Sequence, residues 1–93
     1  MAINLLKMLR RAAPLKVLLQ RDASGMWTTQ MLRWDIGSQG ETQELALSGL
    51  EQIFSLEKKE GLGAFPSAPK RFHTLWESGT LISCDSCFNV RVA

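Results

Sequence analysis

Cysteine is scarce in this sequence: only two of the 93 residues are cysteines, too few for the disulfide framework of a small secreted domain. Long apolar runs are missing as well, and none approaches the about 20 residues that span a membrane. A strong excess of one charge is also missing, because the net charge is only +2. The composition therefore excludes a disulfide-rich scaffold and a transmembrane protein, and by itself it does not indicate a nucleic-acid binder.

The residues that are present indicate one globular domain. Hydrophobic residues make up 45% of the chain and charged residues 22%, with three tryptophans and four phenylalanines. A chain of this length has room for one independent hydrophobic core but not for two. No low-complexity tract is present, so global disorder is not expected.

The charges are unevenly distributed along the chain. Residues 1–21 hold five bases and no acid, whereas residues 22–60 hold seven acids and three bases. A basic end beside an acidic middle is compatible with a nucleic-acid or membrane contact, with a self-complementary oligomer, or with ordinary solvated surface. The charge pattern alone leaves these alternatives open.

Residues 1–14 form a basic amphipathic segment that precedes the domain expected over residues 15–93. The basic residues of this segment follow its apolar residues, which is the reverse of a secretory signal. We therefore expect a cytoplasmic protein, with the segment as a short helix ending near Pro14 and packed on a partner or lying on a membrane surface.

Two strands open the domain. Residues 15–21 are rich in leucine and valine, and residues 26–34 are rich in Trp and Thr, which favour a pleated surface. Residues 22–25 between them, Asp-Ala-Ser-Gly, are typical of a turn, so the two strands should form a β-hairpin. Because both faces of the second strand carry apolar groups, we expect one face to meet a helix and the other a partner or residues 1–14. A short third strand is expected around residues 38–41.

A long helix should follow over residues 43–59. Thr42 is its expected N-cap, and Lys58, Lys59 and Gly61 are typical of its end. Its apolar residues recur at helical spacing and should cover the sheet: Ala46, Leu47, Leu50, Ile53 and Phe54. Gly49 inside the helix costs about 1 kcal/mol relative to alanine, so we expect a close approach of a strand or a neighbour there.

A second, shorter helix should begin after Ser67 as its cap, with Pro69 in its first turn and Gly79 at its end. Residues 87–92 alternate between apolar and polar side chains and predict a final strand. The resulting order is β-β-β-α-α-β, and the fold class is α+β with an antiparallel-dominated sheet and one long helix packed on one face. The last strand must insert beside an earlier one.

A family resemblance appears once these motifs are placed in order. The residues that carry it are Arg21-Asp22, Gly25-Met26-Trp27, Asp35-Ile36-Gly37, Gly40-Glu41-Thr42, Leu45-Ala46, Pro66, Phe72, Trp76 and residues 90–93. Over residues 15–93 this order resembles the HicB-like antitoxin family, although Glu41 stands where that family usually has Asp and Leu45 where it often has Glu. The resemblance implies a partial RNase H-like fold that oligomerises and neutralises a small toxin ribonuclease. Because the sequence ends right after the last strand, we expect a stand-alone member without the C-terminal DNA-binding module of many relatives.

The chemistry-bearing residues favour structural roles. Asp22, Asp35 and Glu41 are the acids that a degenerate RNase H-like hydrolase would use, but the two aspartates sit in turn motifs. Cys84 and Cys87 have the spacing of a redox pair or half a zinc site, and we favour small buried hydrophobes instead. His73 is expected at the solvent edge of the second helix without a nucleophile beside it. We therefore expect no enzyme activity, no metal and no cofactor.

Binding to other macromolecules is the function that remains. We expect a homo-oligomer, dimer or tetramer, and a small toxin protein as a further partner. Its interface, with the partner or with another copy, is predicted at Trp27, Met31, Arg33, Trp34 and Trp76, because tryptophan and arginine dominate protein interfaces. Nucleic-acid binding through residues 1–14 is the alternative, and a degenerate hydrolase is another.

Overall fold

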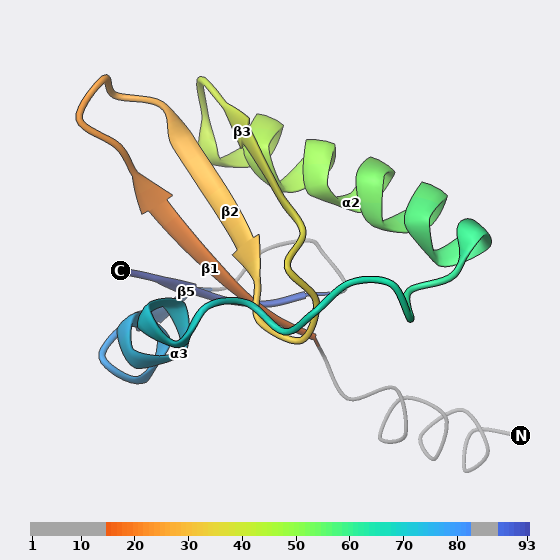
Figure 1. Ribbon diagram of the computed structural model, residues 1–93. Coiled ribbons are helices and arrows are strands. Elements are labelled where there is room, and N and C mark those ends of the chain that lie inside the picture. Colours follow the sequence, from red (N-terminus) through yellow and green to blue (C-terminus); the bar gives the residue numbers. More distant parts are fainter. Residues whose placement is uncertain (1–14, 83–87) are drawn as a thin grey trace, which may run out of the picture.

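The computed structural model describes residues 15–82 and 88–93 (Figure 1). The described elements are, in chain order, β1 (Leu15–Arg21), β2 (Trp27–Met31), β3 (Gly37–Gly40), α2 (Gln43–Glu60), α3 (Lys70–Glu77), β4 (Thr80–Ile82) and β5 (Phe88–Val92). The α+β class expected from the sequence is confirmed. Residues 1–14, and with them the expected N-terminal helix, lie outside the described residues, as do Cys84 and Cys87.

The strands form one five-stranded sheet in the order β3-β2-β1-β5-β4. Three pairings are antiparallel, but the central pair of β1 and β5 is parallel, so the sheet is mixed. In that pair Val17 is opposite Val90, and both side chains are buried. The final strand thus inserts beside the first one, as expected, and joins the two ends of the domain into one sheet.

Two strand predictions need correction. The second strand ends at Met31 rather than at residue 34, because the chain turns there: Met31 N donates a hydrogen bond to Ile36 O, and Leu32 O accepts one from Ala68 N. This turn carries Leu32 out of the strand and into contact with the loop before α3. Strand β4 was not predicted, since three residues are too few to show an alternation; its pairing with β5 defines it.

The helix ends follow the sequence in one case and not in the other. For α2, the Thr42 hydroxyl accepts a 3.1 Å hydrogen bond from Leu45 N, and Gly61 ends the helix with φ of 108°. For α3, the N-cap position is Pro69, which makes no side-chain cap bond. The expected cap, Ser67, instead donates from its hydroxyl to Leu32 O at 3.1 Å, and so connects the loop before α3 to the end of β2.

The sheet lies between the two helices. Helix α2 packs on β3 and β2, whereas α3 contacts β1 (Figure 1). Val17 belongs to the core under α2, and the neighbouring Lys16 places its amine 5.7 Å from the centre of the Trp76 ring of α3. Because successive residues of a strand point to opposite faces, the two helices cover opposite faces of the sheet.

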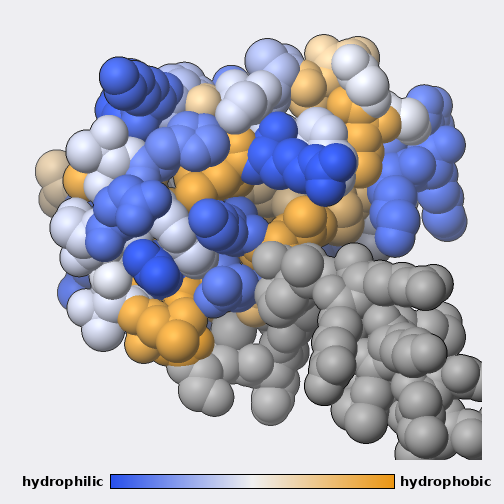
Figure 2. All heavy atoms as spheres, turned by 90° about the horizontal axis from the view of Figure 1, so that it is seen from below, coloured by the Kyte–Doolittle hydropathy of each residue, from blue (hydrophilic) through white to orange (hydrophobic). Residues whose placement is uncertain are grey.

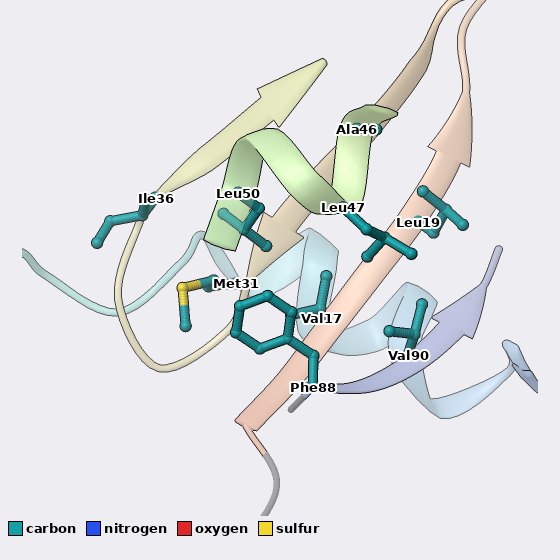
Figure 3. Close-up of a cluster of buried hydrophobic side chains, with 9 residues drawn as sticks. All are labelled: Val17, Leu19, Met31, Ile36, Ala46, Leu47, Leu50, Phe88 and Val90. Carbon is teal, nitrogen blue, oxygen red and sulfur yellow. The ribbon is translucent and has the colours of Figure 1, made fainter. Parts of the chain in front are cut away.

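The main core fills the space between α2 and the sheet. Its nine buried side chains point toward one another in Figure 3: Val17, Leu19, Met31, Ile36, Ala46, Leu47, Leu50, Phe88 and Val90. Phe54 extends this core, with its ring centre 6.1 Å from that of Phe88 and 5.7 Å from that of Trp34. A smaller cluster of Leu32, Ala68 and Trp76, with Phe72 against it, lies on the α3 side. Aromatic and aliphatic burial thus stabilises both faces.

A chain of hydroxyl groups fixes β3 against both of its neighbours. Ser38 Oγ donates to Ala46 O of α2 at 2.6 Å, and it lies 2.7 Å from Thr29 Oγ1 of β2. Since the one hydroxyl proton of Ser38 is used on the Ala46 carbonyl, Thr29 must donate to Ser38. Thr29 is only 3% exposed, and these bonds satisfy its otherwise costly buried hydroxyl.

Candidate functional site

Two of the five predicted interface residues are part of the protein's own core. Met31 is fully buried under α2, and Trp76 is 2% exposed on the inner side of α3. The prediction that Met31 and Trp76 face a partner is therefore wrong for this fold. The sequence pattern misplaced them because it showed no second cover for the sheet, whereas α3 and the loop before it cover Leu32 and its surroundings.

The other three predicted residues lie at the surface, but not in one patch. Trp27 begins β2 and is half-buried, with the Arg21 guanidinium 5.9 Å from its ring centre. Trp34 lies beyond the other end of β2, also half-buried, with the exposed Arg33 4.8 Å from its ring centre. Since Trp27 and Trp34 flank opposite ends of a strand, they do not form a continuous apolar surface.

Cations lie over aromatic rings in several further places. Arg91 lies 4.6 Å from the Trp76 ring centre, Arg71 lies 4.6 Å from that of Phe72, and Lys58 lies 5.9 Å from that of Phe54. Such pairs contribute about 0.5–1 kcal/mol each at exposed sites. The ring faces that a nucleobase would stack on are thus partly occupied by this chain's own side chains, which favours a structural role for these aromatic groups.

Ser67 and His73 form a side-chain pair that the sequence analysis did not expect. His73 Nε2 lies 3.1 Å from Ser67 Oγ and 3.1 Å from Ala68 O, so the serine is near in space and not only in sequence. The pair does not have the form of a nucleophile and its base. A carbonyl only accepts, so Nε2 carries the proton, and Ser67 spends its own proton on Leu32 O. The pair fastens the loop to α3.

The three acids considered for hydrolase chemistry do not gather in one place. Asp22 follows Arg21, which pairs with Trp27 at the start of β2, whereas Asp35 lies beyond the far end of that strand. A five-residue strand is about 13 Å long between its end residues. Glu41 follows Gly40 and so lies at the Asp22 end. Within the described residues, no three His, Cys, Asp or Glu side chains form a metal-binding group.

Asp22 has a local structural task. Its Oδ1 accepts hydrogen bonds from Ser24 Oγ at 2.6 Å, Ser24 N at 2.9 Å and Met26 N at 3.0 Å. These bonds, the one from the Ser24 hydroxyl above all, lower the pKa of the Asp22 carboxyl below its usual range. Gly25 completes the turn with φ of 91°. The predicted Asp-Ala-Ser-Gly turn is confirmed.

The outward side of α2 offers a surface that the sequence analysis had treated as merely solvated. Ser48, Glu51, Gln52, Ser55 and Leu56 line an open depression of about 560 Å³. Glu44 lies on the same side, one helical turn before Ser48. We call Glu44, Ser48, Glu51 and Ser55 the α2 outer face. Two leucines off the core stripe, Leu45 and Leu56, were the sequence signal for further exposed surface, being 57% and 62% exposed.

Figure 2 shows a further face of the molecule, on which hydrophobic areas are separated by hydrophilic side chains. No helix within the described residues is long and apolar enough to cross a membrane. Comparison of the chain with family models, with curated proteins and with solved structures returned no match. The functional argument therefore depends on the residues and on their geometry.

Proposed function

We propose that this chain is a non-enzymatic protein-binding module that resembles the HicB-type antitoxins and binds a small RNA-acting toxin in the cytoplasm as a homo-oligomer. The order of elements carries this proposal. An antiparallel β1-β2-β3 unit, the long helix α2 over it, and a later strand that returns parallel to β1 fit a partial RNase H-like arrangement. The family resemblance of residues 15–93 implies that same arrangement.

The charge of the α2 outer face supports a basic partner. Glu44 and Glu51 point away from the core of the domain and stand beside the small Ser48 and Ser55, where the depression lies. A toxin that acts on RNA needs basic groups for the phosphate backbone. An acidic surface attracts such a protein and competes with its substrate, and complementary charge of this kind raises association rates and selects partners.

The chemistry of the candidate catalytic groups supports binding rather than catalysis. The Ser67 hydroxyl and His73 Nε2 are both engaged with backbone carbonyls, and Asp22 is engaged with the turn that it closes. A degenerate RNase H-like hydrolase would need Asp22, Asp35 and Glu41 in one place, and the fold puts Asp35 at the far end of β2 from the other two.

The test is a titration of this chain with a small basic protein encoded by a neighbouring reading frame. We expect a complex, and we expect Glu44→Lys combined with Glu51→Lys to weaken its affinity by about tenfold or more at low salt. Glu77→Lys, which changes an exposed acid on α3, is the matched control and should bind like the unaltered chain. Absence of a complex, or equal weakening by Glu77→Lys, would contradict the proposal.

Nucleic-acid binding through residues 1–14 is the second candidate. The observation in its favour is the sequence of that segment, which contains Lys7, Arg10 and Arg11 and no acid. If this function is correct, single-stranded RNA should bind with an affinity that falls steeply with salt. Changing Lys7, Arg10 and Arg11 to Glu should then abolish RNA binding, while changes of the α2 outer face should leave it unaltered.

A further inference from the structure

Strand β3 is an edge of the sheet without the usual protection. It pairs with β2 on one side, and no other strand among the described residues pairs with its second side. Its sequence, Gly37-Ser38-Gln39-Gly40, contains no proline and no charged residue. Edge strands normally carry such residues because their open backbone groups attract further strands. An unprotected edge is a place where another strand of stated geometry can pair.

One side of α2 lies directly above this edge. Leu45, Gly49, Gln52 and Leu56 recur every three or four residues and so line one side of the helix, which we call the α2 flank. Its first half leans toward β3: a Cβ atom placed on Gly40 would be 2.9 Å from Leu45 Cβ. Leu45 and Leu56, at the two ends of the flank, are both more than half exposed. The α2 flank is therefore an apolar border next to the open strand.

Gly49 in the middle of the α2 flank has no explanation within the chain. A Cβ atom there would meet only Ser38, at 3.7 Å, which is ordinary van der Waals contact. The expected close approach of a strand to Gly49 is thus not present, although glycine in a helix costs about 1 kcal/mol relative to alanine. Gly40, by contrast, is required, because its Cβ would be 2.7 Å from Ala46 N. A close approach from outside the chain would account for Gly49.

We propose that a second copy of this chain covers this surface, with the two β3 strands paired antiparallel about a two-fold axis and the two α2 helices packed side by side along their flanks. Paired strands lie about 4.8 Å apart. Because α2 sits above β3 and β2, near the edge, the two helices come to about 8–10 Å, the distance of packed helices. The two sheets become one continuous sheet, and the interface is isologous.

The charges of α2 fit this antiparallel arrangement. The helix has Glu44 in its first turn, just after Glu41, and Lys58 and Lys59 in its last turn. A two-fold axis near the middle of the helix brings the acidic beginning of each copy to the basic end of the other. The same axis places Leu45 of one copy near Leu56 of the other, and the two Gly49 residues face the centre. A parallel arrangement would bring like charges together instead.

The surface needs little rearrangement to bind. The hydrogen bonds from Thr29 to Ser38 and from Ser38 to Ala46 O hold β3 and α2 in one fixed relation, so the open edge and the α2 flank are presented together. Preorganisation of this kind lowers the entropic cost of association. The inference rests on the homo-oligomer of the proposed function but not on the toxin, because the α2 outer face stays free in such a dimer.

The experiment is sedimentation equilibrium of the full chain at micromolar concentration. We expect twice the chain mass of 10.4 kDa. Leu45→Gln combined with Leu56→Gln should raise the dimer dissociation constant by about tenfold or more, since two exposed leucines leave the interface. Leu81→Gln is the matched control: Leu81 is 65% exposed at the opposite edge of the sheet, on β4, and this variant should remain a dimer.

Gly49→Gln separates loss of association from loss of folding. Glutamine is a better helix former than glycine, so the variant's helix content should be preserved or raised while the dimer is lost. A monomeric unaltered chain, a dimer that survives Gly49→Gln, or a dimer that only Leu81→Gln disrupts would overturn the inference. Titration of the monomeric variants with the toxin then distinguishes the two proposals, because a monomer that still binds leaves the proposed function standing.

Discussion

Arg91 on β5 reaches across the end of α3 and clasps Trp76. Its Nη1 donates a 3.0 Å hydrogen bond to the Trp76 carbonyl oxygen, and its guanidinium carbon lies 4.6 Å from the centre of the Trp76 ring. The Arg91 Nε is buried and has no hydrogen-bond partner among the described residues. The carbonyl end of a helix attracts positive charge, so this one side chain fastens α3 to the sheet by dipole, hydrogen bond and ring contact.

Replacing Arg91 should therefore cost more than replacing a surface arginine. We expect Arg91→Lys to lower the free energy of unfolding by about 1–2 kcal/mol, because lysine lacks the planar group that stacks and donates at the same time. Arg71→Lys, which changes an exposed cation over Phe72, should cost less than about 0.5 kcal/mol. Urea unfolding followed by tryptophan fluorescence measures both; equal losses would contradict the role of Arg91.

The turn closed by Asp22 should tolerate asparagine but not alanine. Asparagine keeps an Oδ1 acceptor for Ser24 and Met26, whereas alanine has none, so Asp22→Asn should stay near the unaltered Tm at neutral pH and Asp22→Ala should lose a few degrees. Partner binding should also survive Asp22→Asn. Complete loss of an activity in that variant with the fold intact would contradict the structural reading.

The pH dependence of Asp22 follows from its lowered pKa. The folded protein holds the ionised carboxylate better than the unfolded chain, so this stabilisation is complete above the ordinary pKa of 3.8 and is lost as the pH falls through the lower folded value. Between neutral pH and about pH 3, Asp22→Asn should therefore lose less Tm than the unaltered chain. Thermal unfolding at the two pH values checks this, and parallel losses in both proteins would argue against it.

Ser67 should behave as a structural serine. We expect a fluorophosphonate probe, which labels activated serines, to leave Ser67 unmodified, since its proton is given to Leu32 O and His73 Nε2 acts as a donor. Ser67→Ala should instead lower the free energy of unfolding by about 1 kcal/mol through the lost hydrogen bonds. Mass spectrometry of the treated chain decides the first point, and labelling that disappears in His73→Gln would overturn it.

Two glycines should respond oppositely to alanine. At Gly40 the added methyl would sit 2.7 Å from Ala46 N and 2.9 Å from Leu45 Cβ, so Gly40→Ala should cost about 1–3 kcal/mol by forcing β3 and α2 apart. At Gly63 nothing lies within 4 Å, and Gly63→Ala should change stability by less than about 1 kcal/mol. Denaturant midpoints of the two variants provide the comparison, and similar values would mean that the β3–α2 contact is not tight.

The elements that the sequence predicted well are those whose causes are local. The turn at residues 22–25 needs only Asp22 and Gly25 within four residues of each other. Helix α2 begins where Thr42 caps Leu45 N, and its apolar residues repeat with the helical period. The one-domain α+β class and the insertion of the last strand also follow from such patterns, because periodicity and capping act over a few neighbouring residues.

The remaining features were decided by contacts between distant residues. Strand β2 stops at Met31 because Leu32 bonds to Ala68, and Trp76 is core rather than interface because α3 folds onto the sheet and Arg91 holds it there. Neither Met31 nor Trp76 carries a local signal that tells buried from partner-facing, since an apolar side chain is hidden or exposed according to what covers it. The sequence by itself determined the local elements and the number of cores; the tertiary structure decided their cover, because burial is a property of the assembled surfaces and not of any one segment.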